Sequence, residues 1–220
     1  GALRASLLAV DGNPVTPLEV RRIPLAQGQR VDLLLTMPAD GGAFPVIAQR
    51  EGDRQRTGII LASPGSTITR VADLADAPVG PIDLSLETRL AAVVPMANRQ
   101  PDRRHQLALT GSMMPYVWTL DGRSWANRQP LRIKGGQRVE VDLVNKSRMA
   151  HPMHLHGHHF QVVAINGRRL AGAVRDTVHV PPMGMVTVAL DAGEAARWML
   201  HCHHMPHLST GMMTEFAVSA

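Results

Sequence analysis

Short runs of apolar residues alternating with polar ones recur along the chain, separated by Gly, Pro, Asn or Asp. A period of two is typical of a strand with one buried face, and the separating residues are those that tight turns require. A long apolar stripe with helical spacing is missing from the sequence. We therefore expect an all-β protein made of sandwiches or barrels rather than of alternating strands and helices. The clearest predicted strands are RVDLLLTM (30–37), VEVDLVN (139–145), FQVVAING (160–167), DTVHVPP (176–182) and MVTVALDA (185–192).

A pattern near the start of the chain returns roughly 110 residues later, which indicates an internal repeat. Asp11-Gly12 matches Asp121-Gly122, and Gly28-Gln29-Arg30-Val31 matches Gly136-Gln137-Arg138-Val139. The stretch between the two copies is rich in Pro, Ala and Asp and has little periodicity, as linkers do. We therefore predict a first domain at 1–66, a linker at 67–104 and a second domain at 105–220.

Composition excludes several classes of protein. The chain has 220 residues, 45% of them hydrophobic, and no apolar run approaches the roughly 18 residues of a membrane-spanning helix. The net charge of +5 comes almost wholly from scattered arginines, because Lys134 and Lys146 are the only lysines. Scattered charge argues against nucleic-acid binding. The first residues, GALRASLLAVDG, lack the features of a signal peptide.

Most of the histidines lie in two short windows, MAHPMHLHGHHF (149–160) and WMLHCHHMPHLSTGMM (198–213). The second window also holds the single cysteine, Cys202. On a strand, alternate side chains point to opposite faces, so His201 and His203 share one face and Cys202 points to the other. A lone cysteine between histidines is more readily a metal ligand than half of a disulfide. We therefore predict two metal sites, one on each face of a single strand.

Residue spacing divides the ligands between these two sites. His154 and His156 stand two positions apart and share a face, whereas His151 has the opposite parity. Cysteine, two histidines and a weak axial methionine form the blue-copper set. Zinc is the alternative metal, since cysteine and histidine also suit tetrahedral zinc. We assign His151, Cys202, His207 and Met212 to a mononuclear copper site, with Met213 as the alternative axial ligand, and His154, His156, His201 and His203 to a histidine-only cluster.

The segments HPMHLHGHHF and HCHHMPHLSTGMM resemble the two C-terminal copper motifs of the multicopper oxidases, the laccase-like family. The earlier LAVDGNPVTPLEVRRIPLAQGQRVDLLL and GIILAS resemble the later part of that family's middle cupredoxin domain. The resemblance thus covers nearly the whole chain. It implies a cupredoxin-like Greek-key β-sandwich or barrel fold, with one partial domain that lacks copper ligands and one complete domain that carries them.

The resemblance also implies what the sites do. Phenols, aromatic amines or Cu(I) would reduce the type 1 copper, and a trinuclear copper cluster would reduce O2 to water. Electrons would pass from Cys202 to the flanking His201 and His203, so Cys202, His201 and His203 are the implied catalytic residues. The implied ligands are His151, Cys202, His207 and axial Met212 for the type 1 copper, His154 for the type 2 copper, and His156, His201 and His203 for the type 3 pair.

The chain departs from the family pattern in two respects. It lacks the two earlier motifs with His-x-His pairs, so it offers half of the histidines that a trinuclear cluster uses. We expect the N-terminal portion of the same oxidase, or a partner chain, to supply the rest, with a symmetric dimer as the alternative. Leu208 stands where some bacterial relatives carry a proton-relaying carboxylate. A periplasmic or secreted location is expected by analogy, and a non-enzymatic electron-transfer or copper-binding protein is the competing hypothesis.

The remaining polar residues of the windows have other expected places. We expect His158 to be hydrogen-bonded beside the cluster, and His159 and His204 to lie at the surface or at the rim of a site. Asp176 is a candidate to orient a ligand imidazole, with a turn or strand-edge role as the alternative.

Overall fold

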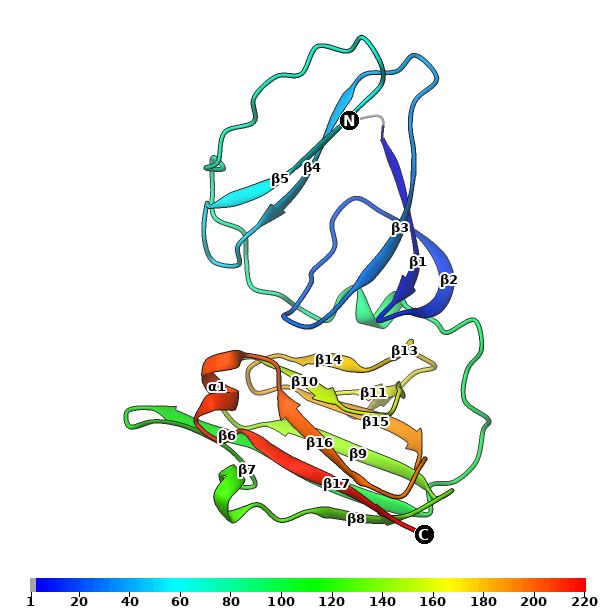
Figure 1. Ribbon diagram of the computed structural model, residues 1–220, viewed down its shortest axis with the longest axis vertical. Helices are drawn as coiled ribbons and strands as arrows, with labels where there is room; N and C mark the ends of the chain where they lie inside the picture. Colours follow the sequence, from blue (N-terminus) through cyan, green and yellow to red (C-terminus); the bar gives the residue numbers. More distant parts are fainter. Residues whose placement is uncertain (1–2) are drawn as a thin grey trace.

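The computed structural model describes residues 3–220 and contains two regions joined by a long connection (Figure 1). The first region holds two small antiparallel sheets, drawn in blue and cyan at the top of the figure. One sheet has the strand order β2-β1-β3 and the other pairs β4 with β5. The strands are β1 (Arg4–Val10), β2 (Asn13–Val20), β3 (Val31–Thr36), β4 (Ala43–Gln49) and β5 (Arg56–Ala62).

The second region is a sandwich of two larger sheets (Figure 1). One has the order β14-β10-β16-β17-β8, and the other has the order β12-β11-β15-β9-β6-β7, with β13 paired to β11. Strands of both sheets come from distant parts of the sequence, as in a Greek key. Their bounds are β6 (Arg103–Met113), β7 (Tyr116–Leu120), β8 (Leu131–Lys134), β9 (Arg138–Asn145), β10 (His151–Leu155), β11 (Phe160–Ile165), β12 (Arg168–Arg169), β13 (Val174–Arg175), β14 (Thr177–Val180), β15 (Met185–Asp191), β16 (Arg197–Cys202) and β17 (Met213–Ser219).

The alternating sequence pattern produces these sheets. Side chains of β8 alternate strictly between buried and exposed, and those of β3 between half-buried and exposed. The inner faces of the two large sheets meet in one apolar core that contains Leu143 and Val188 from one sheet and Leu200 and Phe216 from the other. Burying an aromatic or branched aliphatic side chain of this size contributes roughly 1.5–3 kcal/mol, so this core dominates the stability of the second region. The all-β prediction is confirmed.

Helical structure is confined to three short segments among the described residues. They are the 3-10 helices η1 (Glu87–Arg89) and η2 (Trp125–Asn127) and the α-helix α1 (Met205–Ser209). None of the helices in the described part of the chain is long and apolar enough to cross a membrane.

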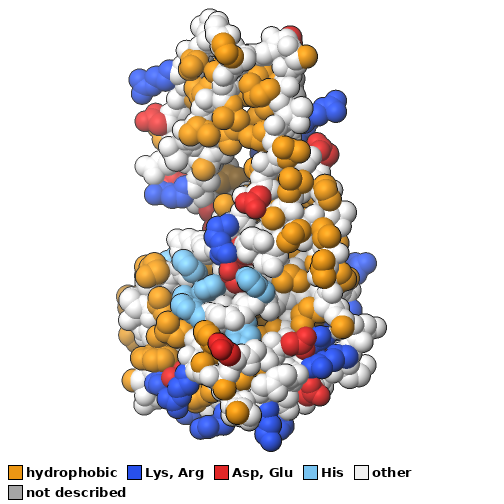
Figure 2. Space-filling model, turned by 45° about the vertical axis from the view of Figure 1, so that its right-hand side comes forward, with side chains coloured by type: hydrophobic (Ala, Val, Ile, Leu, Met, Phe, Trp, Pro, Cys, Tyr) orange, Lys and Arg blue, Asp and Glu red, His pale blue; other side chains and the backbone are white. Residues whose placement is uncertain are grey.

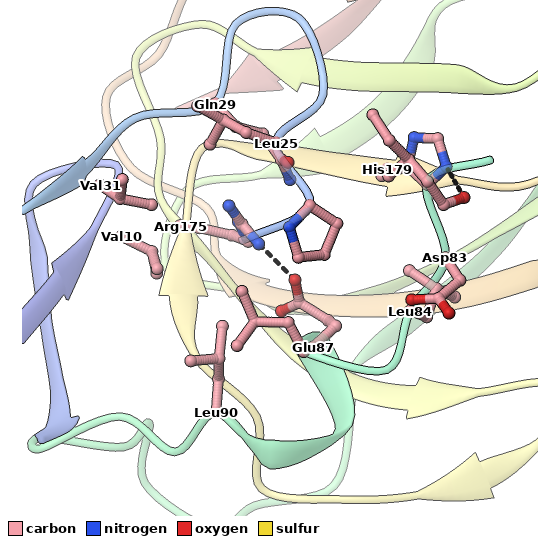
Figure 3. Close-up of a pocket in the computed structure, with 13 residues that line it drawn as sticks. Val10, Leu25, Gln29, Val31, Asp83, Leu84, Glu87, Leu90, Arg175 and His179 are labelled. Carbon is pink, nitrogen blue, oxygen red and sulfur yellow. Dashed lines mark hydrogen bonds and ion pairs between the residues drawn. The ribbon is translucent and has the colours of Figure 1, made fainter. Parts of the chain in front are cut away.

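The connection between the regions packs against both of them. Leu86 and Leu90, on either side of η1, belong to the same apolar cluster as Leu7 of β1 and Ala173, which lies just before β13. A small cavity of about 20 Å³ lies at this junction and is lined by residues from all three parts (Figure 3). The two regions therefore share a packed boundary, and this boundary lies next to the strands that carry the histidines.

The internal repeat corresponds to repeated backbone geometry. Asp11 and Asp121 have φ of 47° and 52°, and the glycines that follow them have φ of 77° and 71°. Gly28 and Gly136 also share positive φ, 83° and 76°. This left-handed region is strained for most residues but open to Asp, Asn and Gly, which explains why these residue types recur at equivalent turns.

Candidate metal centre

The cysteine site lies inside the sandwich, where β16 ends. The Sγ atom of Cys202 is 3.7 Å from Nδ1 of His151 and 3.7 Å from Nδ1 of His207, and the two Nδ1 atoms are 3.1 Å apart. All three side chains are fully buried. Strand pairing produces this convergence, because β10 begins at His151 and lies beside β16, with Met153 opposite Cys202. One thiol and two imidazoles thus face a single point.

Burial keeps these three groups neutral when no metal is bound. It raises the pKa of the Cys202 thiol to about 12, against the opposing effect of a hydrogen bond from the His204 N–H. Burial, reinforced by neighbouring histidines, lowers the pKa of His151 to about 3 and that of His207 to about 4. Both rings therefore keep a lone pair available for a metal at neutral pH. A divalent cation would displace the thiol proton and stabilise the thiolate.

A hydrogen-bond chain behind His151 sets which ring nitrogen faces the site. His151 Nε2 lies 2.8 Å from Ser147 Oγ, and Ser147 in turn donates to Oδ1 of Asn145, 2.9 Å away. The Asn145 amide donates to the backbone carbonyls of Met149 and Val180. The proton of His151 is thereby held on Nε2, so the Nδ1 lone pair points toward Cys202.

The loop from Cys202 to β17 closes the other side of the site. His207 lies in α1 and is stacked between Trp118 and His204, with ring centroids 4.1 Å away in each case. Met212 is fully buried in the same apolar core as Cys202, whose N–H donates to the Met212 carbonyl. Met213 instead begins β17 and pairs with His201. Burial and position therefore favour Met212 over Met213 as the axial thioether.

The histidine-only cluster lies on the opposite face of the same strands. Nε2 of His156 and Nε2 of His201 are 3.0 Å apart, and the His154 ring centroid lies 4.9 Å from that of His156 and 5.5 Å from that of His201. Nitrogens of these three rings all lie within 4.8 Å of one another. They are less buried than the cysteine site, and pale-blue histidine side chains are visible on this side of the molecule in Figure 2.

Backbone carbonyls orient two of these rings toward the cluster. His154 Nδ1 lies 2.9 Å from the Asp176 carbonyl, and His201 Nδ1 lies 3.0 Å from the Cys202 carbonyl. A carbonyl can only accept, so each Nδ1 carries the hydrogen and each Nε2 keeps its lone pair. The two Nε2 atoms of His156 and His201 are close enough for His156 to donate a hydrogen bond to His201, or for both to bind one cation.

His203 is the predicted ligand that stands apart. It lies just past the end of β16, where its N–H donates to the Pro152 carbonyl, and its ring centroid is 5.9 Å from that of His154 and 6.0 Å from that of His201. It is outside the group of three whose nitrogens lie within 4.8 Å. Its ring packs against Gly28 of the first region.

The other histidines of the two windows lie outside both groups of converging ligand atoms. His158 is bonded through Nδ1 to the His156 carbonyl, and its Nε2 accepts from the Gly193 N–H, which confirms its expected hydrogen-bonded place. His159 is exposed, and His204 is half-buried at the rim of the cysteine site. Sequence reasoning missed Ser147, Asn145 and Trp118. An Asn-x-Ser turn directly before the first histidine window was the available signal for the first two.

The donor set fits copper well. A cysteine thiolate, two imidazoles and a buried thioether are the soft and borderline ligands of a blue-copper site, and imidazoles alone also suit copper. A β-sandwich that carries these two sites back to back on one strand belongs to the cupredoxin class of copper proteins.

Comparison with known proteins agrees with this class. Family models described as multicopper oxidase match residues 6–66 and 98–220. Multicopper oxidase MmcO of Mycobacterium tuberculosis is 34% identical over 212 residues, a match covering 93% of this chain and 40% of that protein. A copper resistance protein A homolog of Pseudomonas syringae is 36% identical over 120 residues, covering 54% of this chain and 20% of the relative. The chain therefore belongs to the multicopper oxidase family, whose metal is copper.

Solved structures support the fold. McoA multicopper oxidase from Aquifex aeolicus has a TM-score of 0.69 at 25% identity, covering 99% of this chain and 50% of that one. A laccase from Botrytis aclada has a TM-score of 0.79 at 17% identity, covering 98% of this chain and 48% of that one, and so shows the fold alone. The chain spans half or less of the length of these relatives.

Proposed function

We propose that the chain is the part of a copper-dependent oxidase that takes up electrons and supplies half of the oxygen-reducing site. His151, Cys202, His207 and Met212 would hold a type 1 copper, and His154, His156, His201 and His203 would hold part of a trinuclear copper cluster. When bound, these coppers would accept electrons one at a time from a reducing substrate and deliver four to O2, giving water. The remaining histidines would come from the rest of the oxidase or from a partner chain.

One observation carries this proposal: the backbone joins Cys202 directly to His201 and His203, the proposed ligands of the other site. The Cys202 carbonyl accepts a hydrogen bond from Nδ1 of His201, 3.0 Å away, while Cys202 Sγ faces His151 and His207 on the opposite face. Backbone and hydrogen bond together give a short bonded path between the two sites. A copper-storage protein has no need of such a path, which favours the oxidase over a protein that only stores copper.

The residues beside His207 support a class of reducing substrate. The β6–β7 hairpin carries Trp118 and Tyr116 next to the His207 ring, and its tip presents Met113 and Met114, which are 62% and 90% exposed. Apolar aromatic residues suit phenols and aromatic amines, and exposed thioethers suit Cu(I). We propose that electron donors of these kinds approach at this hairpin. A periplasmic or secreted location, expected from the family, is part of the same proposal.

Copper stoichiometry with visible and paramagnetic-resonance spectra tests the proposal on the purified chain, with oxygen uptake measured on a phenol. An intense blue absorption with a narrow copper hyperfine splitting is expected for the Cys202 site, together with a second, ordinary copper signal. Oxygen consumption is expected once the missing histidines are supplied by the complete oxidase. A blue protein that never consumes oxygen in that assembly would establish the electron-carrier alternative.

Two variants separate the sites. Cys202→Ser should abolish the blue absorption and leave the ordinary copper signal, because it removes the thiolate alone. The double variant His201→Ala, His203→Ala should keep the blue absorption and lose the ordinary signal. Blue absorption that survives Cys202→Ser would show that the ligand assignment is wrong.

A further inference from the structure

We propose that the first region, which holds none of the predicted copper ligands, positions the histidine-only cluster. It does so through its Gly28-Gln29-Arg30 turn and through Asp11. This inference rests on the proposed function of the cluster. These residues do not bind a metal, and the sequence marks them only as one copy of an internal repeat. The turn forms the boundary between the regions directly above the cluster.

Arg30 makes the most direct of these contacts. Its two terminal nitrogens donate to the two carboxylate oxygens of Asp176 at 2.9 and 2.7 Å, a bidentate pair with fixed geometry. The Asp176 carbonyl accepts from His154 Nδ1, and Asp176 Oδ1 lies 3.5 Å from the same nitrogen. Arg30 therefore holds in place the residue that sets the tautomer and ring orientation of His154.

Gln29 and Asp11 hold the next residue, Thr177, from the same side. Gln29 Nε2 donates to the Thr177 carbonyl at 3.2 Å, and the Thr177 N–H donates to Asp11 Oδ2 at 3.2 Å. Thr177 Oγ1 lies 3.0 Å from His154 Nδ1. Both residues that surround the back of the His154 ring are thus bound to the first region.

The charged residues that anchor this turn are buried. Asp11 also accepts hydrogen bonds from the Arg30 N–H and from Arg175 Nε, and Arg175 in turn pairs with Glu87 of η1 (Figure 3). Asp11 and Arg175 have almost no exposed side-chain surface, 0% and 4%. The turn is therefore anchored to both the linker and the second region.

Gly28 contacts the cluster itself. A Cβ atom built on Gly28 would lie 2.5 Å from Cδ2 of His203, and Gly28 has φ of 83°. Only glycine lets the backbone approach this close to the imidazole. The His203 ring, which is the ligand farthest from the other three, is therefore kept in place by the backbone of the first region.

The second copy of the repeat shows that this arrangement is particular to the first. Arg138, the counterpart of Arg30, pairs with Asp191 and donates to the Ala97 carbonyl, so it lies far from any ligand histidine. Gly136, the counterpart of Gly28, has nothing within 4 Å of its Cβ position. Gly136 is therefore a matched control for Gly28, whereas Arg138 is buried and does not match the half-exposed Arg30.

The test compares Arg30→Gln with Arg169→Gln, and Gly28→Ala with Gly136→Ala, in the purified chain. Arg169 is 61% exposed and donates to a Glu140 carboxylate oxygen at 2.9 Å, so it matches Arg30 in exposure and in the kind of partner. The Arg30 side chain is 54% exposed, so its loss should hardly affect folding. We expect Arg30→Gln and Gly28→Ala to weaken Cu(II) binding at the histidine-only cluster by about 10-fold or more and to change its hyperfine splitting. The blue absorption should stay unchanged. Each control should leave both signals as they are.

A second readout on the metal-free chain separates this inference from the proposed function. Nitrogen NMR of the histidine rings should show His154 with its proton on Nδ1, and Arg30→Gln should broaden or mix this tautomer while Arg169→Gln does not. No Cu(II) binding at the cluster in the unsubstituted chain would overturn the proposed function. An unchanged His154 tautomer in Arg30→Gln, or equal copper affinity in Arg30→Gln and Arg169→Gln, would overturn the positioning role.

Discussion

Ser147 does not itself bind metals, but it contacts His151, a proposed copper ligand. Its hydroxyl is the partner of His151 Nε2 inside a buried network that ends on Asn145. Ser147→Ala leaves that ring nitrogen without a partner in an apolar environment, which we expect to cost about 1–3 kcal/mol of stability in the metal-free protein. Copper affinity at the Cys202 site should fall about 10–100-fold, because ring orientation is lost.

Urea denaturation and competitive copper titration, followed by the blue absorption, measure these two effects. Ser112→Ala is the control, since the Ser112 hydroxyl bonds the Met114 carbonyl at the exposed hairpin tip. Equal copper affinities in the two variants would show that Ser147 does not orient His151.

At the scale of elements, the loop between β16 and β17 sets the position of Met212, the proposed thioether ligand. Gly211 has φ of 111°, and a Cβ there would lie 2.8 Å from Cβ of Ser124 and 3.1 Å from the backbone N of Trp125. Gly211→Ala should therefore cost about 1–3 kcal/mol of stability through backbone strain. It should also shift the blue absorption, because Met212 follows directly.

Gly122→Ala is the matched control for this substitution. Gly122 also has positive φ, 71°, but nothing lies within 4 Å of its Cβ position. It should lose stability in urea denaturation without any change in the absorption spectrum. A spectral shift in Gly211→Ala no larger than that in Gly122→Ala would show that the loop does not position Met212.

Strand parity is the part of the site that sequence predicts well. The two-residue period of β16 places Cys202 and His201 on opposite faces, and the pairing of β10 with β16 brings the two histidine windows together. Sequence spacing could not predict that Trp118 stacks on His207 or that Arg30 reaches Asp176, because these contacts depend on how distant strands pack. The assignment of individual ligands to individual coppers stays a prediction.

The whole molecule depends on a buried ion cluster at the boundary between its regions. Arg175 lies between Asp11 and Glu87, and all three side chains are nearly or completely buried. Burial raises the pKa of Glu87 despite the nearby guanidinium. Arg175→Met would leave the buried Glu87 without a counter-charge and Asp11 with only the Arg30 guanidinium, 3.9 Å away, which we expect to cost about 3–5 kcal/mol of stability.

The chemical denaturation midpoint measures this loss, with Arg104→Met as the control. Arg104 is 65% exposed and pairs with Glu140 at 3.5 Å, so its removal should cost about 1 kcal/mol or less. A loss for Arg175→Met as small as that of the control would show that the boundary does not depend on charge pairing.

Buried histidines make the stability of the metal-free protein depend on pH. Burial lowers the pKa of His179, and the nearby Arg175 lowers it further. Together these effects outweigh Glu51 and Asp83, which raise it. Burial also lowers the pKa of His105. In the unfolded chain these rings titrate near their ordinary pKa of about 6.5. Between that value and the lower folded pKa, the unfolded state binds more protons, so stability falls as the pH drops below about 6.5.

We therefore expect a lower urea midpoint at pH 5.5 than at pH 7.5 for the metal-free protein. His179→Gln should reduce this difference, because glutamine cannot bind the proton yet can still donate to the Ile82 carbonyl, as His179 Nε2 does at 3.2 Å. His159→Gln is the control, since it makes the same substitution at an exposed histidine. The same decline in His179→Gln as in the unsubstituted protein would exclude His179 as one of the groups responsible.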